Sequence, residues 1–427
     1  MLRLLASGPI LYIDPGTGSM LFSILIGVLG AAYYFFRSAF IKLKYSVSNN
    51  KTEVKSASRL DYAIFSDDKR YWNIFKPICE EFEARQVELT YFTASEDDPV
   101  LNQDFQYVHA EYLGPGNRAF TRLNMLNAVI VLSTTPSLDV YQWKRSKDAQ
   151  FYVHIAHMPN DISAYEMFGL DHYDAILLSG EYQIRQIREL ERLRNLPEKE
   201  CVLVGLPYMD DLKRQLDAAP PKHSERKTVL LAPSWGKNGI LRKYGSKMLD
   251  ALIATGYDIV VRPHPQSWSS EKSIMDALME KYPDSEHFHW NRDTSNFEVL
   301  RCSDVLISDF SGVIFDYTLV FDKPVIYTDI SAFDKSAWDA AWIDEELWTF
   351  QVLPKLGEQL EDDRLDHIKE VIDRVTDEPK YQIARNTARA ETWVYAGEGA
   401  RRTADYLIAK HTALTGAFSG QEESDLK

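Results

Sequence analysis

Short apolar runs rich in β-branched and aromatic residues recur along the chain, and segments with a helical period of apolar residues separate them. Runs of this kind are typical of buried β-strands, whereas a period of 3.6 residues is typical of an amphipathic helix. A first series of runs occupies residues 61–67, 87–93, 128–134 and 173–179, with helical segments such as 70–85 and 181–194 between them. Strands that alternate with helices usually pair in parallel, so this half of the chain predicts a parallel sheet covered on both faces.

A polar segment with two adjacent prolines, DAAPPKHSERK at 217–227, interrupts this rhythm and predicts a linker. A second series of runs follows, at residues 228–235, 257–265, 304–310 and 323–328, again with helices between them. We therefore predict an α/β protein with two Rossmann-like domains, whose ligand lies in the cleft between them at the carboxyl ends of the strands. The predicted boundaries are 51–220 for the first domain, 221–390 for the second, and 391–427 for a closing helix and a flexible tail.

The N-terminal segment, residues 1–50, differs from the rest because residues 15–36 carry no charge. As a helix this stretch is long enough to cross a hydrocarbon core of about 30 Å. A cleaved signal peptide and a buried core helix are the alternatives, but the aromatic cluster at 33–36 does not resemble a small-residue cleavage site. Basic residues at 37–55 come next, so the positive-inside rule predicts a single-pass anchor in the cell membrane with residues 50–427 on the cytoplasmic side.

Charge and cysteine content narrow the functional classes. The formal net charge is −15, whereas a nucleic-acid-binding protein needs a basic face to displace counterions, so we expect no nucleic acid among the partners. The three cysteines lack the Cys and His spacing of a metal site, so no metal ligands are predicted. No strand precedes the glycine pattern of a dinucleotide-binding turn or a Walker A sequence, which disfavours a dehydrogenase and a P-loop enzyme.

A polar turn, residues 308–312 with the sequence SDFSG, separates two apolar runs of the second series. A strand ends there and a helix is predicted to begin, so free backbone N–H groups and the positive end of the helix dipole would form an anion site. Gly312 would let a phosphate approach the backbone, and Ser311 would cap the helix or donate its hydroxyl to a phosphate oxygen. The alternative is that Ser311 is only a helix cap and Asp309 only a turn residue.

Two more polar loops follow strands of the same domain. The sequence RPHP places Arg262 and His264 at one strand end, and the prolines on both sides of the histidine stiffen the loop and exclude a helix. The sequence APSWGKNG leaves another strand end and supplies Ser234, Trp235 and Lys237. Because the carboxyl ends of parallel strands meet at one edge of a sheet, we expect these loops and the polar turn to share one site.

The sequences LAPSWGKNG, RPHP and SDVLISDFSGVIFDYTLVFDKPVIY, in that order, resemble the CDP-glycerol glycerophosphotransferase family, membrane-associated teichoic acid primases and polymerases with a GT-B fold. The resemblance runs through residues 150–410 and implies a GT-B architecture. The family has a Trp-His-Gly-Thr-Pro stretch where this chain reads HIAHMPND, so His157 falls on the family histidine, with His154 nearby as a second candidate. The family often has a second serine where Gly312 stands, and this change removes a hydroxyl but keeps the backbone donors.

The resemblance implies a reaction in which an acceptor hydroxyl attacks the β-phosphate of CDP-glycerol and CMP leaves. It makes the first domain the acceptor domain, with His157 as general base, and the second the nucleotide-donor domain. His264 and Asp309 are the other implied catalytic residues; the former would bind the diphosphate and the latter would hold the loop or the acceptor. The residues that the resemblance assigns to the donor phosphates and nucleotide are Ser234, Trp235, Lys237, Arg262, Ser308, Ser311, Gly312 and Asp316. Trp235 would stack on cytosine or belong to the core, and Arg262 would help to hold the diphosphate or form a structural ion pair.

The implied partners are CDP-glycerol or a similar CDP-polyol, a lipid-linked or polymeric acceptor, and the membrane, in the biosynthesis of the cell envelope. No cofactor is expected, although a diphosphate can recruit Mg²⁺ without a dedicated motif. A GT-B glycosyltransferase that uses a UDP-sugar is one alternative, because the fold serves both reactions and Asp316 would then clamp a ribose. The other is a non-catalytic binding protein, which the loss of the Trp-His-Gly stretch permits.

Overall fold

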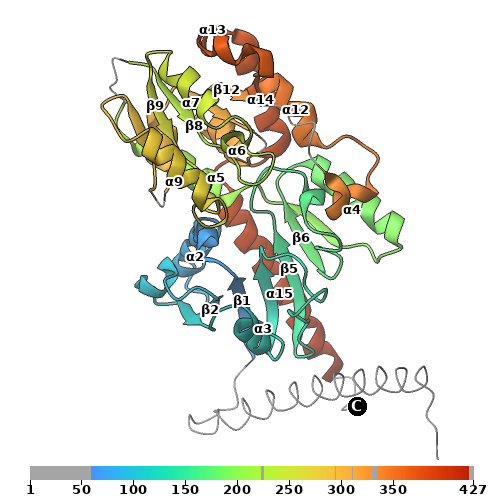
Figure 1. Ribbon diagram of the computed structural model, residues 1–427. Helices are drawn as coiled ribbons and strands as arrows, with labels where there is room; N and C mark the ends of the chain where they lie inside the picture. Colours follow the sequence, from blue (N-terminus) through green and yellow to red (C-terminus); the bar gives the residue numbers. More distant parts are fainter. Residues whose placement is uncertain (1–58, 223–225, 294, 310, 329–333, 423–427) are drawn as a thin grey trace, which may run out of the picture. The chain divides into compact units, whose positions relative to one another are not determined.

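Two parallel β-sheets carry the fold, and each follows one of the two series of apolar runs (Figure 1). The computed structural model describes residues 59–222, 226–293, 295–309, 311–328 and 334–422. The predicted membrane span at 15–36 lies outside these residues, as does the rest of the chain before residue 59. Within the described part, no helix is both long and apolar enough to cross a bilayer.

The first sheet has seven strands in the order β3-β2-β1-β4-β5-β6-β7, coloured blue to green in Figure 1. The strands are β1 (Leu60–Ser66), β2 (Leu89–Thr93), β3 (Val108–Tyr112), β4 (Ala128–Ser133), β5 (Ala149–Ile155), β6 (Ala175–Leu178) and β7 (Glu200–Leu203). All neighbours are parallel, and every residue of β4 and β6 is buried, as expected of strands with helices on both faces. The parallel sheet predicted from the first series of runs is therefore confirmed.

The second sheet has six strands in the order β10-β9-β8-β11-β12-β13. The strands are β8 (Thr228–Leu231), β9 (Asp258–Val261), β10 (Phe288–Trp290), β11 (Val305–Ser308), β12 (Val325–Tyr327) and β13 (Gly357–Gln359). They are again parallel, so the carboxyl ends of β8, β9 and β11, which are neighbours in the sheet, point to the same edge. The three polar loops of the sequence leave these three strands.

Helices connect the strands of both sheets. Those before the second sheet are α2 (Trp72–Ala84), α3 (Asn117–Leu123), α4 (Glu181–Arg194) and α5 (Pro207–Ala218). Those that follow are α6 (Ile240–Lys243), α7 (Ser246–Ile253), α8 (Ser267–Ser270), α9 (Lys272–Lys281), α10 (Phe297–Cys302), α11 (Val313–Phe315), α12 (Trp348–Leu356), α13 (Ile368–Asp377), α14 (Pro379–Thr392) and α15 (Gly399–Glu422). Helix α15 contacts α2, α5 and β4, so the last helix lies against the first sheet.

The helix predicted after the polar turn is present, but only its first residues form a regular α-helix. Helix α11 has three residues and continues without a break as a π-helix, η5 (Asp316–Val320). The Thr318 hydroxyl donates to the Ile314 carbonyl at 2.7 Å, and a side chain that bonds the preceding turn in this way competes with the regular backbone ladder. Gly312, rather than Ser311, precedes the first helical residue, and no side chain caps this helix. Of the two roles predicted for Ser311, the helix cap is therefore not formed, and the bond to a phosphate oxygen stays a prediction.

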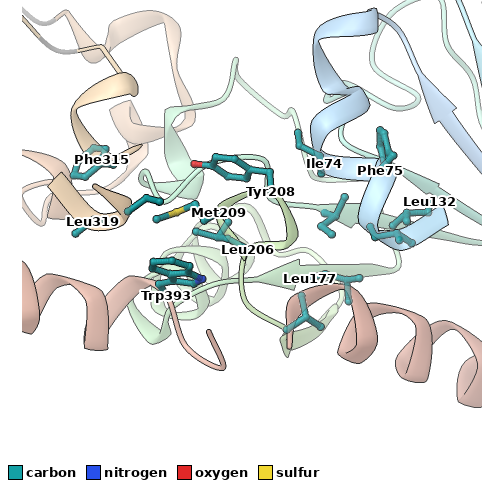
Figure 2. Close-up of a cluster of buried hydrophobic side chains, with 14 of the residues drawn as sticks. Ile74, Phe75, Leu132, Leu177, Leu206, Tyr208, Met209, Phe315, Leu319 and Trp393 are labelled. Atoms are coloured by element: carbon teal, nitrogen blue, oxygen red, sulfur yellow. The ribbon is translucent and has the colours of Figure 1, made fainter. Parts of the chain in front are cut away.

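One apolar core continues from the helices of the first sheet to those of the second. Figure 2 shows Leu206, Tyr208 and Met209, at the start of α5, beside Phe315, Leu319 and Trp393. Five of these side chains are no more than 6% exposed and Trp393 is 7% exposed, so this contact is closed to water. Burial of so many apolar side chains holds the two sheets together next to the polar turn.

Candidate functional site

His157 lies just after the end of β5, and hydroxyl groups hold one nitrogen of its ring. Nδ1 is 3.0 Å from Thr134 Oγ1 and 2.9 Å from the Tyr165 hydroxyl, and the Tyr71 ring centroid lies 5.2 Å from the imidazole. Burial lowers the pKa of His157 to about 4, and the positive charge of Arg70 acts in the same direction. The imidazole is therefore neutral near pH 7 and able to accept a proton.

His154 stands inside β5 and is fully buried. Its Nε2 is 3.1 Å from the Tyr165 hydroxyl, which thus lies between the two histidines. Burial lowers the pKa of His154 well below its ordinary value, and His157 adds to this effect. A fully buried ring cannot meet a substrate, so of the two candidates only His157 has access to one.

The polar turn joins the ends of β8 and β11 through hydrogen bonds. The Ser308 hydroxyl donates to the Ala232 carbonyl at 2.6 Å, inside the sheet. Asp309 is 0% exposed, and its two carboxylate oxygens accept from the Ser234 backbone N–H at 3.1 and 2.9 Å. Ser308 and Asp309 therefore fix the loops, and only Ser311 and Gly312 of the described residues of the turn are partly open to solvent.

The polar turn faces the loop that carries His157. A Cβ atom at Gly312 would lie 3.5 Å from both Sδ and Cε of Met158, the residue after His157. This close approach connects the strand-end loops of the two sheets. It brings His157, which follows β5 of the first sheet, and the predicted phosphate site, which follows β11 of the second sheet, to the same place.

His264 lies beside the same loops. Its Nδ1 accepts from the Gln266 backbone N–H at 3.1 Å, so the neutral ring carries its hydrogen on Nε2. The Trp235 ring lies 6.4 Å away and is 48% exposed, which excludes the core role for this tryptophan. Burial lowers the pKa of His264 and Arg70 lowers it further, while Glu271 opposes the shift. His264 is thus a neutral hydrogen-bond donor at the edge of the second sheet.

Arg70 was missed by the sequence analysis. It belongs to η2 (Lys69–Tyr71), which follows β1, and its guanidinium donates to Asp68 Oδ2 at 3.0 Å. Its charge lowers the pKa of both His157 and His264, so it lies within electrostatic range of the two rings. The sequence contained enough information to predict Arg70 as a site residue, because the stretch SDDKRYW follows the carboxyl end of a central strand, where ligands of such sheets bind.

Three other residues that were predicted for the site either make their hydrogen bonds elsewhere or are exposed. Arg262 donates to the Asn291 side chain and to the Asp293 carbonyl, so its guanidinium holds a neighbouring loop of the second domain. Asp316 accepts from the Tyr208 hydroxyl of α5 at 3.0 Å, in the contact between the two sheets. Lys237 is exposed. The residues that the structure brings together are thus His157, His264, Ser234, Trp235, Asp309, Ser311 and Gly312, with Ser308 behind them.

The described residues contain no group of three or more His, Cys, Asp or Glu side chains that would hold a metal ion. A hollow of about 380 Å³ lies elsewhere, between α4, α12 and α14, where Tyr182, Trp348 and Glu391 line it. The chemistry of the strand-end loops identifies the candidate site.

Comparison with known proteins connects these loops to a family. A family model described as CDP-Glycerol:Poly(glycerophosphate) glycerophosphotransferase matches residues 125–339. This range includes His157, His264 and the polar turn. No curated protein matches the chain.

Solved structures show where the fold recurs. A structure of the wall teichoic acid polymerase TagF soaked with CDPG is 16% identical, covers 88% of this chain and 98% of that chain, and has a TM-score of 0.55. A UDP co-structure of S. aureus MnaA is 10% identical, with coverage of 83% and 97% and a TM-score of 0.56. A putative UDP-N-acetylglucosamine 2-epimerase from Listeria monocytogenes is 11% identical, with coverage of 81% and 95% and a TM-score of 0.52. The α/β fold with two parallel sheets therefore has GT-B-like neighbours.

Proposed function

The chain belongs to the CDP-glycerol:poly(glycerophosphate) glycerophosphotransferase family, and we propose that it moves glycerol phosphate, or a related polyol phosphate, from a CDP-activated donor to an acceptor hydroxyl. The acceptor is a lipid-linked or surface-polymer molecule, and CMP is the other product. The observation that carries the proposal is the close approach of Met158 to Gly312, where an added Cβ atom would lie 3.5 Å from the Met158 thioether. It supports a site in which a neutral histidine stands opposite a phosphate-binding turn.

His157 is the general base in this proposal. The acceptor oxygen forms a bond to the β-phosphorus of the donor, the bond from that phosphorus to the CMP oxygen breaks, and the acceptor proton passes to Nε2 of His157. Among the described residues Nε2 has no hydrogen-bond partner, which leaves it available to a hydroxyl group. The other nitrogen, Nδ1, is already engaged by two hydroxyl oxygens.

The donor diphosphate is held from both domains. His264 donates from Nε2, the backbone N–H groups near Gly312 approach the phosphate oxygens, and Arg70 supplies a positive charge from the first domain. Charge neutralisation is the main requirement of phosphoryl transfer, because the transferring group carries several negative oxygens. We propose no bound cofactor; Mg²⁺ carried by the diphosphate itself would add to this neutralisation.

Trp235, Ser234 and Lys237 lie on the loop after β8 and are proposed to contact the nucleotide. The exposed indole of Trp235 offers a face on which cytosine would stack. A UDP-sugar donor is less well supported, because the carboxylate of Asp316 that would clamp its ribose is engaged by Tyr208. The membrane anchor at 15–36 and the cytoplasmic position of residues 50–427 remain proposals.

The test is transfer from radiolabelled CDP-glycerol to a membrane extract, with UDP-sugars as competing donors and His157→Asn as the matched variant. The expected result is label in the polymer or lipid fraction, with one CMP released per transfer and a loss of about 100-fold or more in the variant. Label transferred from a UDP-sugar, or equal turnover in His157→Asn, would contradict the proposal.

A further inference from the structure

A chain of hydrogen bonds lies behind His157. The Thr134 hydroxyl donates to the Ile155 carbonyl at 2.9 Å, and the same oxygen is 3.0 Å from Nδ1 of His157. The Tyr165 hydroxyl is 2.9 Å from this Nδ1 and 3.1 Å from Nε2 of His154. Thr134 and Tyr165 come from different segments, one after β4 and one after the loop that follows β5, so both orient the ring from outside its own strand.

The direction of the Thr134 bond determines where His157 carries its hydrogen. A hydroxyl group has one proton, and Thr134 gives that proton to the Ile155 carbonyl. Toward His157 the Thr134 oxygen can therefore only accept, so Nδ1 must carry the hydrogen. The opposite tautomer would place a nitrogen lone pair 3.0 Å from an oxygen lone pair, with no hydrogen between them.

We infer that Thr134 is a positioning residue that holds His157 as the Nδ1–H tautomer, which leaves the lone pair of Nε2 free to accept the acceptor proton. This inference rests on the proposed function only for the role of Nε2; the tautomer itself is a property of the resting protein. Tyr165 completes the arrangement, because its oxygen is a second acceptor for Nδ1–H and its own proton goes to His154 Nε2.

His154 bears on the direction of the Tyr165 proton but not on the Thr134 bond. Its Nδ1 is buried and has no hydrogen-bond partner in the described part of the chain. This nitrogen carries an unpaired hydrogen when the Tyr165 proton points to His154, and an unpaired lone pair when that proton points to His157. The unpaired N–H of His154 is thus the cost of the inferred arrangement, and the hydrogen bond from Nδ1 of His157 to Thr134 offsets it.

The groups that hold Nδ1 of His157 are the neutral hydroxyls of Thr134 and Tyr165, and this limits the strength of His157 as a base. After Nε2 takes the proton, the imidazolium keeps its Nδ1–H bonds to Thr134 and Tyr165 but gains no ion pair from them. Such a base is weaker than a histidine backed by a carboxylate. A weak base suits phosphoryl transfer through a loose transition state, in which the attacking oxygen has formed little of its new bond.

Nitrogen NMR of the full-length protein labelled with ¹⁵N-histidine tests the tautomer without any substrate. The His157 signals are assigned by their loss in His157→Asn. In the wild type and in Thr134→Ser, which keeps the hydroxyl, Nδ1 should appear protonated and Nε2 unprotonated at pH 7. In Thr134→Val the Tyr165 proton can turn toward Nδ1, so the Nε2–H form should become populated. An Nε2–H tautomer in the wild type, or an unchanged tautomer in Thr134→Val, would overturn the inference.

Turnover gives a second, independent measurement. In Thr134→Val we expect kcat to fall about tenfold, the scale of one lost neutral hydrogen bond, while KM for CDP-glycerol changes less than about twofold. Thr134→Ser should restore kcat. A merely structural role would instead lower the melting temperature and change both constants together. If the NMR result is as expected but no variant or wild-type protein transfers glycerol phosphate, the proposed function fails and the tautomer assignment stands.

Discussion

Replacing Asp316 with asparagine is expected to stabilise the protein above pH 7 and to flatten the pH dependence of its stability. Asp316 begins η5, and its carboxylate accepts from the Tyr208 hydroxyl in the contact between the two sheets. Burial raises the pKa of Asp316 from 3.8 to about 7, and the hydrogen bonds from Tyr208 and Asn296 offset only part of this effect. The folded protein therefore resists the charged form of this side chain.

The sign and size of the pH effect follow from the difference between the pKa of Asp316 in the folded protein and its ordinary value in the unfolded chain. Between pH 4 and pH 7 the folded state holds a proton on Asp316 that the unfolded state has released, so the contribution of Asp316 to stability is highest below pH 4 and falls as the pH rises toward 7. Since one pKa unit corresponds to 1.36 kcal/mol, the rise from 3.8 to about 7 amounts to at most about 4 kcal/mol above pH 7. Asparagine has no charge to bury and keeps an oxygen that accepts from Tyr208, so the variant avoids this cost.

Calorimetric unfolding at several values between pH 5 and pH 8 measures the effect. Asp322→Asn is the matched control, because Asp322 follows the same segment but pairs with Arg385 at 2.8 Å and Arg389 at 2.6 Å. These arginines lower the pKa of Asp322, so its contribution is present at neutral pH and is lost only in acid. The two variants should thus change stability in opposite directions at pH 8. A lower melting temperature for Asp316→Asn at pH 8 would refute the reasoning.

Two further predictions concern ligand binding. Gly312→Val should weaken CDP-glycerol binding far more than Ser311→Ala, which removes one hydroxyl worth about 1 kcal/mol. The Cβ atom of the valine would make an ordinary contact with Met158 at 3.5 Å, but the branched side chain would cover the backbone N–H groups. Equal affinities in calorimetric titration would remove the phosphate role of the turn. Arg70→Gln should raise KM for the donor about tenfold or more. It should also raise the pKa of His157, which moves the acidic limb of the pH–rate profile to higher pH. An unchanged profile would show that Arg70 lies outside the site.

The grouping of the polar loops at the strand ends could be predicted, because it depends only on the local sequence and on the parallel direction of the strands. Parallel strands direct their carboxyl ends to one edge, so the residues after β8, β9 and β11 had to meet, whatever the details of packing. The mutual arrangement of Asp309 and Ser234 follows from this rule. The change from an α-helix to a π-helix after Phe315 does not follow from it, because the Thr318 hydroxyl competes with the backbone and a π-helix has no distinct apolar period.

Contacts across distant segments were not predictable from the pattern. Thr134 and His157 are 23 residues apart, and Tyr208 and Asp316 are 108 residues apart. Each pair consists of residue types that are common in loops and helices, so nothing in the local sequence distinguishes them. Arg70 is an intermediate case, since its position after a strand marks it for the site edge, whereas its effect on His157 depends on how the first sheet packs.

The His157 loop is fixed at both ends by parts of the chain that lie far away in sequence. Met158 contacts Gly312, and Asp161, which is 3% exposed, accepts from the backbone N–H groups of Trp348 and Thr349 at 2.8 and 2.9 Å. Those two groups begin α12, so Asp161 caps a helix that lies between β12 and β13 of the second sheet. Any movement of the second sheet against the first must therefore carry the His157 loop with it or break a buried cap. The distance between His157 and the polar turn is thus coupled to the contact between the two sheets.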